Sequence, residues 1–239
     1  MIPKIIHYCW FGPEAMPRLV EKCIASWHEH MPEPEWTYKL WNEQNFDISS
    51  HPYVQEAYEA GKYAFVTDYV RLWVLLHEGG IYMDTDVEVF RPYDDTLLQL
   101  RAFTGYEGSK HHPPVTGTVA SEAGGIWVAE QLHEYDGLHF LQKDGTPDLT
   151  TNTTRITAAM ERGGFVSDGK RQVYRDMTIF PVDYFCPRQT TGELLITDHT
   201  YCDHHFMASW DERQRSWLYR LIGPAHMTRL IKLKRRLVG

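Results

Sequence analysis

The apolar positions in the first third of the chain follow two different spacings. Short runs of apolar, β-prone residues predict buried strands, whereas apolar residues three and four positions apart predict amphipathic helices. The longest helical pattern ends at Gly79, a residue type that is common at helix C-termini. In chain order, the pattern predicts a strand at 4–10, a helix at 17–29, a strand at 36–41, helices at 52–60 and 63–78, and a strand at 81–83.

This alternation of strands and helices predicts an α/β fold with a mostly parallel central sheet flanked by helices. Ligands of such sheets bind at the carboxyl ends of the strands. Trp10, Asp84 and Asp86 lie at the carboxyl ends of predicted strands, so we expect them at one edge of the sheet.

The pattern weakens after Pro92, and no boundary for a second domain is visible, so residues 1–212 are predicted to form a single domain. In this part, a helix and a strand are expected within 97–107, helices at 125–133 and 152–162, and a strand at 178–184.

Composition narrows the class of protein. A chain of 239 residues with 43% hydrophobic residues is large enough for a full core. Its 4 cysteines are widely spaced, which favours reduced thiols in a reducing compartment over a disulfide scaffold. No apolar run approaches the length of a membrane span, and the N-terminus lacks the layout of a signal peptide. We therefore expect a cytoplasmic location.

The charge is unevenly distributed. The net charge of −8 divides into −16 on residues 1–212 and +8 on residues 213–239. The segment 231–237 alternates apolar and basic residues. Two interpretations of this basic, helical C-terminal tail remain open: a solubilising helix end, or contact with the anionic inner face of a membrane. Nucleic acid is the weaker candidate partner, because the acidic body would repel phosphate.

Asp84 and Asp86 are the strongest candidates for chemistry. Side chains two residues apart on an extended strand project to the same side, so the two carboxylates would face one ligand. Paired carboxylates suit Mg²⁺ or Mn²⁺, which completes its coordination with phosphate oxygens and water. The spacing therefore predicts a divalent cation that holds a diphosphate and offsets its charge.

Two further groups of residues carry candidate chemistry. Asp68 and Arg71 share one face of the apolar helix at 63–78, where buried charges require partners. They form either a structural ion pair or a pair that binds sugar and phosphate oxygens. His204, His205 and Trp210 form a second cluster, which offers an imidazole ligand and an indole donor.

Taken together, these motifs resemble glycosyltransferase family 32, the DXD-motif sugar transferases that include capsular-polysaccharide enzymes and initiating mannosyltransferases. The core motifs are also similar to those of the large glucosylating toxins. The segments that carry the resemblance are 2–12 (IPKIIHYCWFG), 41–46 (WNEQNF), 63–72 (YAFVTDYVRL), 79–87 (GGIYMDTDV) and 204–210 (HHFMASW). The resemblance implies a GT-A-type fold. It also implies sugar transfer from a nucleotide donor with retention at the anomeric carbon, and the usual donor in the family is a UDP-sugar. The acceptor implied is a glycan or a lipid-linked saccharide.

The resemblance also implies roles for individual residues. Carried over by position, Asp68 and Arg71 grip the donor sugar, Asp84 bridges ribose, sugar and metal, and Asp86 ligates Mn²⁺ or Mg²⁺ directly. The other implied roles are stacking on the base for Trp10, a further metal ligand for His205, contact with the diphosphate for Trp210 and, by a looser match, contact with the reacting sugar for Asn152.

Two alternatives belong to other classes of protein. The segment 84–87 also fits the nucleophile motif of haloacid-dehalogenase-like phosphohydrolases, in which Asp84 attacks phosphate. That assignment leaves Asp68 and Arg71 without a role. The second alternative is a non-catalytic glycan-binding module that uses the aromatic residues as stacking platforms.

Overall fold

The structure is a computed structural model that describes residues 1–107, 114, 117–188 and 193–207. Its strands are β1 (Ile5–Cys9), β2 (Thr37–Trp41), β3 (Gly80–Met83), β4 (Val87–Val89), β5 (Ala102–Gly105), β6 (Thr118–Ser121), β7 (Gln172–Tyr174), β8 (Met177–Phe180) and β9 (Cys202–His204). Its helices are α1 (Arg18–His30), α2 (Pro52–Glu59), α3 (Tyr63–Glu78), α4 (Asp95–Leu98), α5 (Ile126–His133) and α6 (Asn152–Arg162), with a 3₁₀ turn η1 (Ile48–Ser50).

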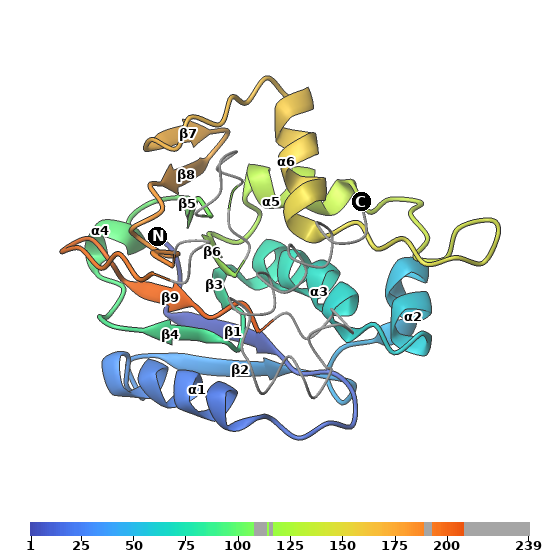
Figure 1. The fold of residues 1–239 in the computed structure, drawn as a ribbon, viewed down its shortest axis with the longest axis horizontal. Helices are drawn as coiled ribbons and strands as arrows, with labels where there is room; N and C mark the ends of the chain where they lie inside the picture. Colours follow the sequence, from blue (N-terminus) through green and yellow to red (C-terminus); the bar gives the residue numbers. More distant parts are fainter. Residues whose placement is uncertain (108–113, 115–116, 189–192, 208–239) are drawn as a thin grey trace, which may run out of the picture.

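Seven strands form the central sheet in the order β2-β1-β3-β6-β5-β8-β7, and β4 and β9 form a separate two-stranded ribbon (Figure 1). Strands β2, β1 and β3 are mutually parallel, as are β5 and β8. Strand β6 is antiparallel to β3 and β5, and β7 is antiparallel to β8. Five of the seven strands therefore run in one direction, which confirms the predicted α/β fold with a mostly parallel sheet.

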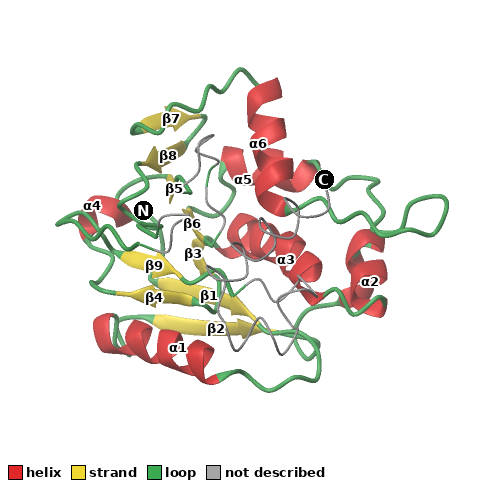
Figure 2. Ribbon diagram, viewed as in Figure 1, coloured by secondary structure: helices red, strands yellow, loops and turns green. Residues whose placement is uncertain are grey.

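Helices cover both faces of the sheet, also as predicted (Figure 2). On one face, α3 packs on β1, β3 and β6, and α2 and α5 pack on α3. On the other face, α1 packs on β4, and the Trp27 indole donates a hydrogen bond of 2.7 Å to the Val87 carbonyl. Each face has its own hydrophobic core. Among the described residues, no helix is both long and apolar enough to cross a membrane.

The buried side chain of His7 fixes the end of α3 against β1. Trp41 Nε1 can only donate, so His7 Nδ1 accepts its hydrogen bond at 3.0 Å and His7 Nε2–H donates to the Gly79 carbonyl at 2.8 Å. Burial lowers the pKa of His7, in keeping with this neutral form. Gly79 and Gly80 have φ of 66° and 104°, and a side chain on Gly80 would lie 2.7 Å from the Ile5 carbonyl. The glycine pair is therefore what lets β3 enter the sheet beside β1.

Candidate functional site

The Asp84–Asp86 segment lies where β3 leaves the carboxyl edge of the sheet. The sequence predicted that this segment would stay extended. Instead, the Val87 amide donates to the Asp84 carbonyl at 3.0 Å and closes a turn. The turn rather than the strand pleat brings the two carboxylates together. Trp10 follows β1, the parallel neighbour of β3, and so lies at the same edge; its indole N–H donates to the Glu14 carbonyl at 2.7 Å.

A histidine from the far end of the chain completes a cluster with this pair. Strand β9 pairs with β4 and sets His204 opposite Val87. His204 Nε2 then lies 3.2 Å from Asp86 Oδ1 and 3.8 Å from Asp84 Oδ2. Ligand atoms of all three residues lie within 4.8 Å of one another, so the cluster could hold one metal ion.

The structure moves the third candidate ligand from His205 to His204. Neighbouring side chains on a strand point to opposite faces. His205 Nε2 therefore lies 2.8 Å from Glu88 Oε2, while its backbone amide donates to the Asp86 carbonyl at 3.0 Å. His205 thus joins β9 to β4 and holds the backbone of Asp86. The structure thus makes His204, in place of His205, the candidate third ligand, a choice that residue spacing alone does not reveal.

The electrostatics of the cluster favour an ion pair between His204 and Asp86. Burial is the largest single effect and by itself lowers the pKa of His204 and raises that of Asp86, but the charged and hydrogen-bonding neighbours of each group together outweigh it. The pKa of His204 rises to about 9, with Asp84 and Glu107 adding to the effect of Asp86. The pKa of Asp86 falls to about 2, with help from the Met207 amide, which donates to its Oδ2 at 2.7 Å. A proton on His204 thus balances part of the acidic charge that a cation would balance when bound.

Gly117 leaves room for the cluster, and this gives a direct test. A Cβ at Gly117 would lie 2.9 Å from His204 Nδ1 and 3.3 Å from Asp84 Oδ2. We expect Gly117→Ala to displace these two side chains and to weaken Mn²⁺ binding about tenfold, the lower end of the effect of disturbing a metal's supporting residues. Calorimetric titration with Mn²⁺ measures the change. Ser49→Ala on the distant turn η1 is a suitable control. Gly124→Ala is not, because Gly124 has φ of 72°, a conformation that strains any residue with a side chain. Unchanged Mn²⁺ affinity in Gly117→Ala would contradict this placement of the ligands.

Asp68 and Arg71 are linked directly to the cluster. Arg71 Nη2 donates to Asp68 Oδ1 at 2.9 Å and lies 3.3 Å from Asp84 Oδ1. The Tyr82 hydroxyl also donates to Asp84 Oδ1 at 2.9 Å, and the Arg71 guanidinium lies 4.7 Å from the centre of the Tyr82 ring. Helix α3 and the segment after β3 therefore meet through a buried network of one cation and two carboxylates.

Asn152 lies beside Asp68, at the first position of α6. Its backbone N–H donates to the Asp68 carboxylate. Its side chain is buried, yet neither amide atom has a hydrogen-bond partner among the described residues. A buried polar group of this kind calls for a partner such as a ligand or water. Burial raises the pKa of Asp68 to about 7 despite the nearby Arg71, so this carboxylate also lacks full compensation.

Sequence reasoning missed Glu107, which follows β5 as Asp84 follows β3. Burial raises the pKa of Glu107. The other groups that act on its carboxyl group are His204, Asp84 and Thr153. It therefore lies between the cluster and α6. Its position just past the end of a strand was the signal that could have identified it. Trp210, the tail at 213–239 and the 108–113 loop lie outside the described residues.

Comparison with known proteins supports the sequence resemblance. A family model described as "Glycosyltransferase sugar-binding region containing DXD motif" matches residues 17–103. The chain is 32% identical over 110 residues to "Mannosyl phosphorylinositol ceramide synthase CSH1" of Saccharomyces cerevisiae, and this alignment covers 43% of this chain and 27% of that protein. It is 30% identical over 151 residues to the synthase SUR1 of the same yeast, and this alignment covers 59% of this chain and 37% of that protein. The chain thus matches roughly a third of the length of these relatives.

A solved structure shows the fold over nearly the whole chain. It is a glycosyltransferase "involved in the glycosylation of the major capsid of PBCV-1", which superposes with a TM-score of 0.50 and 10% identity over 89% of this chain and 99% of that one. At this identity the likeness concerns the fold, which is the expected GT-A type. The family match includes Asp68, Arg71 and the Asp84–Asp86 pair. Residues 17–103 therefore match the model of glycosyltransferase sugar-binding regions that contain a DXD motif, in a chain with a GT-A-type fold.

Proposed function

We propose that this protein is a metal-dependent, retaining glycosyltransferase that moves a sugar from a nucleotide-sugar donor to a glycan or lipid-linked saccharide. One observation carries the proposal: Asp84, Asp86 and His204 form a candidate metal site that Arg71 joins to Asp68. A metal site for a diphosphate and a buried carboxylate for sugar hydroxyls then lie on either side of one guanidinium. A nucleotide sugar presents the same two chemical groups side by side.

The residues present fit a divalent cation. Asp84 and Asp86 offer carboxylate oxygens and His204 an imidazole nitrogen, and the cation's other positions would remain for diphosphate oxygens and water. Mg²⁺ takes oxygen ligands, so the imidazole favours Mn²⁺. When bound, the cation would supply positive charge to the departing diphosphate.

The chain's own side chains would divide the remaining work. Arg71 places a fixed positive charge 3.3 Å from the carboxylate of Asp84, where it can stabilise charge that develops on the leaving group. Asp68 and the unpaired amide of Asn152 would bind hydroxyl groups of the sugar. Trp10, at the same edge of the sheet, would contact the base.

The donor and acceptor are further parts of the proposal. Family resemblance favours a UDP-sugar and an acceptor in surface polysaccharide synthesis. The names of the curated relatives specify mannosyl transfer to inositol phosphoceramide, which makes a mannose donor and a lipid acceptor the second combination to test. The cytoplasmic location, and contact of the basic tail with a membrane surface, stay predictions.

The pKa of His204 leads to a pH dependence of metal binding. With a pKa of about 9, the imidazole is protonated at neutral pH and must release its proton to bind a cation. Between pH 6 and 8 we expect Mn²⁺ affinity to rise about tenfold per pH unit, with release of about one proton per ion. Calorimetry in buffers of different ionisation enthalpy counts the protons. Affinity that is constant over this range would show that no ligand carries a proton.

The same shift predicts how the stability of the metal-free protein changes with pH. Since the pKa of His204 in the folded protein lies above the ordinary histidine pKa of 6.5, the stabilisation is fully present below pH 6.5 and is lost as pH rises through about 9. The lowered pKa of Asp86 acts in the opposite range: its contribution is present above pH 3.8 and is lost as pH falls through about 2.

The function is tested by incubation with UDP- and GDP-sugars, with and without Mn²⁺, while NMR follows the free sugar and the nucleoside diphosphate. We expect slow Mn²⁺-dependent hydrolysis of one donor, whose released sugar first appears with the anomeric configuration of the donor. Phosphate release from sugar phosphates without nucleotide-sugar turnover would instead favour the phosphohydrolase. Binding of saccharides without any turnover would favour the glycan-binding module.

A further inference from the structure

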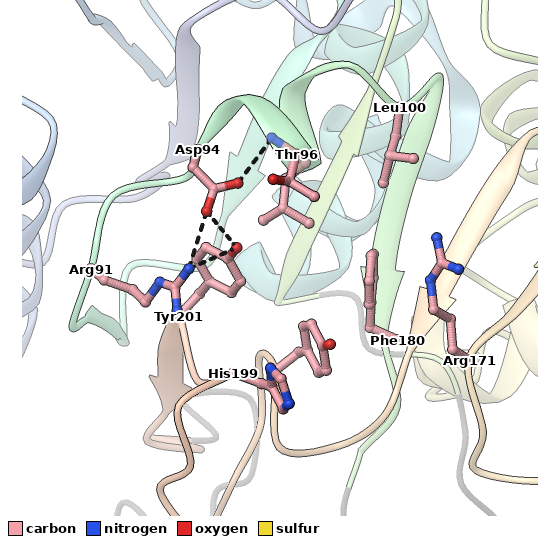
Figure 3. Close-up of a pocket in the computed structure, with 10 residues that line it drawn as sticks. Arg91, Asp94, Thr96, Leu100, Arg171, Phe180, His199 and Tyr201 are labelled. Carbon is pink, nitrogen blue, oxygen red and sulfur yellow. Dashed lines mark hydrogen bonds and ion pairs between the residues drawn. The ribbon is translucent and has the colours of Figure 1, made fainter.

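A second pocket, of about 440 Å³, lies beside α4, away from the metal cluster (Figure 3). The β4–β9 ribbon separates the two places. His204 pairs with Val87 at one end of the ribbon, whereas Arg91 and Tyr201 of the pocket lie beyond the other end. The volume is within the range of pockets that bind small molecules, which is about 300–1,000 Å³. The proposed donor site uses none of the residues that line it.

Aromatic rings form much of the pocket wall. Phe180 and Tyr184 stack with their centroids 4.7 Å apart, and Tyr184 stacks on His199 at 5.2 Å with only 3° between the ring planes. Tyr201 lines the pocket on another side, where Figure 3 shows it with Arg91. Because these rings stack on one another, and Phe180 and Tyr201 are only 6% and 5% exposed, they offer a ligand their apolar edges rather than free faces. Such edges can contact the C–H groups of a pyranose, while its hydroxyls contact the hydrogen-bonding groups nearby.

The charged groups in the wall differ in how fully they are paired. Arg91 is held in place, because Nη2 lies 3.0 Å from Asp94 Oδ2, Nη1 donates to the Asp198 carbonyl at 2.7 Å, and the guanidinium lies 4.1 Å from the centre of the Tyr201 ring. Asp94 is likewise occupied, since it also accepts hydrogen bonds from the Tyr201 hydroxyl at 2.8 Å and the Thr96 amide at 3.0 Å.

Arg171 is the exception. Its guanidinium lies 5.3 Å from the centre of the Phe180 ring, and within the described part of the chain no carboxylate is within ion-pair distance of it. Because Arg91 and Asp94 pair with each other, Arg171 gives the pocket wall a positive charge, in a protein whose net charge is −8. An arginine with its planar fork free is suited to bidentate contact with a carboxylate or phosphate.

We propose that this pocket binds an acidic saccharide unit, a pyranose that carries a carboxylate or a phosphate. The sugar ring lies against the exposed edges of Phe180, Tyr184 and Tyr201, and the acidic group binds Arg171. If the chain is the glycosyltransferase proposed above, this unit is a distal part of the acceptor, held apart from the reacting sugar. That role rests on the proposed function, whereas binding in the pocket does not.

The test is calorimetric titration, in EDTA, of the full chain carrying Asp86→Asn, which keeps ligands out of the metal site. The probes are methyl glucuronide and glucose 6-phosphate, compared with neutral methyl glucoside and with inorganic phosphate. We expect one or both acidic sugars to bind at least tenfold more tightly than the neutral sugar and than phosphate alone. The preferred probe distinguishes a carboxylate ligand from a phosphate ligand.

Arg171→Gln should weaken acidic-sugar binding at least tenfold and leave the neutral sugar unchanged. The matched control is Arg175→Gln in the same hairpin, because Arg175 pairs with Glu130 at 2.8 Å and does not line the pocket. His199→Ala should weaken binding of both sugars through loss of the stacked ring. No binding of either acidic sugar, or equal binding by Arg171→Gln and the parent, would overturn the proposal. Nucleotide-sugar binding by Arg171→Gln with Asp86 intact tests the proposed function separately.

Discussion

Replacement of Asp86 with Asn is expected to lower Mn²⁺ affinity by at least about 100-fold, since loss of residues that merely support a metal ligand already costs 10- to 100-fold. Asn is close to Asp in shape, and its amide oxygen can still accept the 2.7 Å hydrogen bond from the Met207 amide. It lacks the negative charge that attracts the cation and that raises the pKa of His204. The fold should therefore persist while the cation site is lost.

The measurement is Mn²⁺ titration followed by donor hydrolysis at saturating nucleotide sugar. Asp144→Asn is the control, because the Asp144 carboxylate also accepts a hydrogen bond from a backbone amide, that of Thr146 at 2.9 Å, but on an exposed loop outside the cluster. Both metal binding and turnover should fall together in Asp86→Asn and remain unchanged in Asp144→Asn. Turnover within threefold of the parent in Asp86→Asn would show that the reaction does not depend on this carboxylate.

Replacement of Arg71 with Leu is expected to lower the free energy of unfolding by about 3–5 kcal/mol, the cost of removing one partner from a buried ion pair. The Arg71 side chain is only 6% exposed, and its loss leaves the carboxylates of Asp68 and Asp84 facing each other without the cation between them. Without the guanidinium, burial and the neighbouring carboxylate of Asp84 raise the pKa of Asp68 further, so the loss should be smaller at pH 5 than at pH 8.

Urea denaturation of the metal-free protein measures this loss. The double variant Asp68→Asn/Arg71→Leu removes one of the two carboxylates along with the cation, and it should be more stable than the sum of the single changes predicts. Arg71→Lys serves as the comparison that keeps the charge without the planar fork: it should fold and yet lose donor turnover. A loss below about 1 kcal/mol in Arg71→Leu would mean that the network is solvated.

Most elements near the site were predictable because each has a strong local signal. Helix α3 has sixteen residues and a glycine cap, and β1 is an unbroken β-prone run. The strands that the sequence did not predict, β4, β6, β7 and β9, have only three or four residues each. Such segments are defined mainly by their pairing partners, which for β4 and β9 lie more than one hundred residues apart.

The same distinction applies to the site. Asp68, Arg71, Asp84 and Asp86 come from one continuous stretch of helix and strand, so their meeting followed from local structure. The choice between His204 and His205 depended on a register of β9 against β4 that no local pattern carries. The contribution of Glu107 depended on β5 running in the same direction as β3, which follows only from the two antiparallel pairings of β6.

The proposed function requires that Asp84, Asp86 and His204 bind a divalent cation that also holds the nucleotide sugar. Pulsed electron paramagnetic resonance of the Mn²⁺-loaded protein with its nucleotide sugar tests this most directly. The account predicts ¹⁴N coupling from one imidazole together with ³¹P coupling from the diphosphate. The ¹⁴N coupling should vanish in His204→Ala and persist in His205→Ala. A Mn²⁺ spectrum with no ³¹P coupling, or with ¹⁴N coupling that survives in His204→Ala, would contradict it.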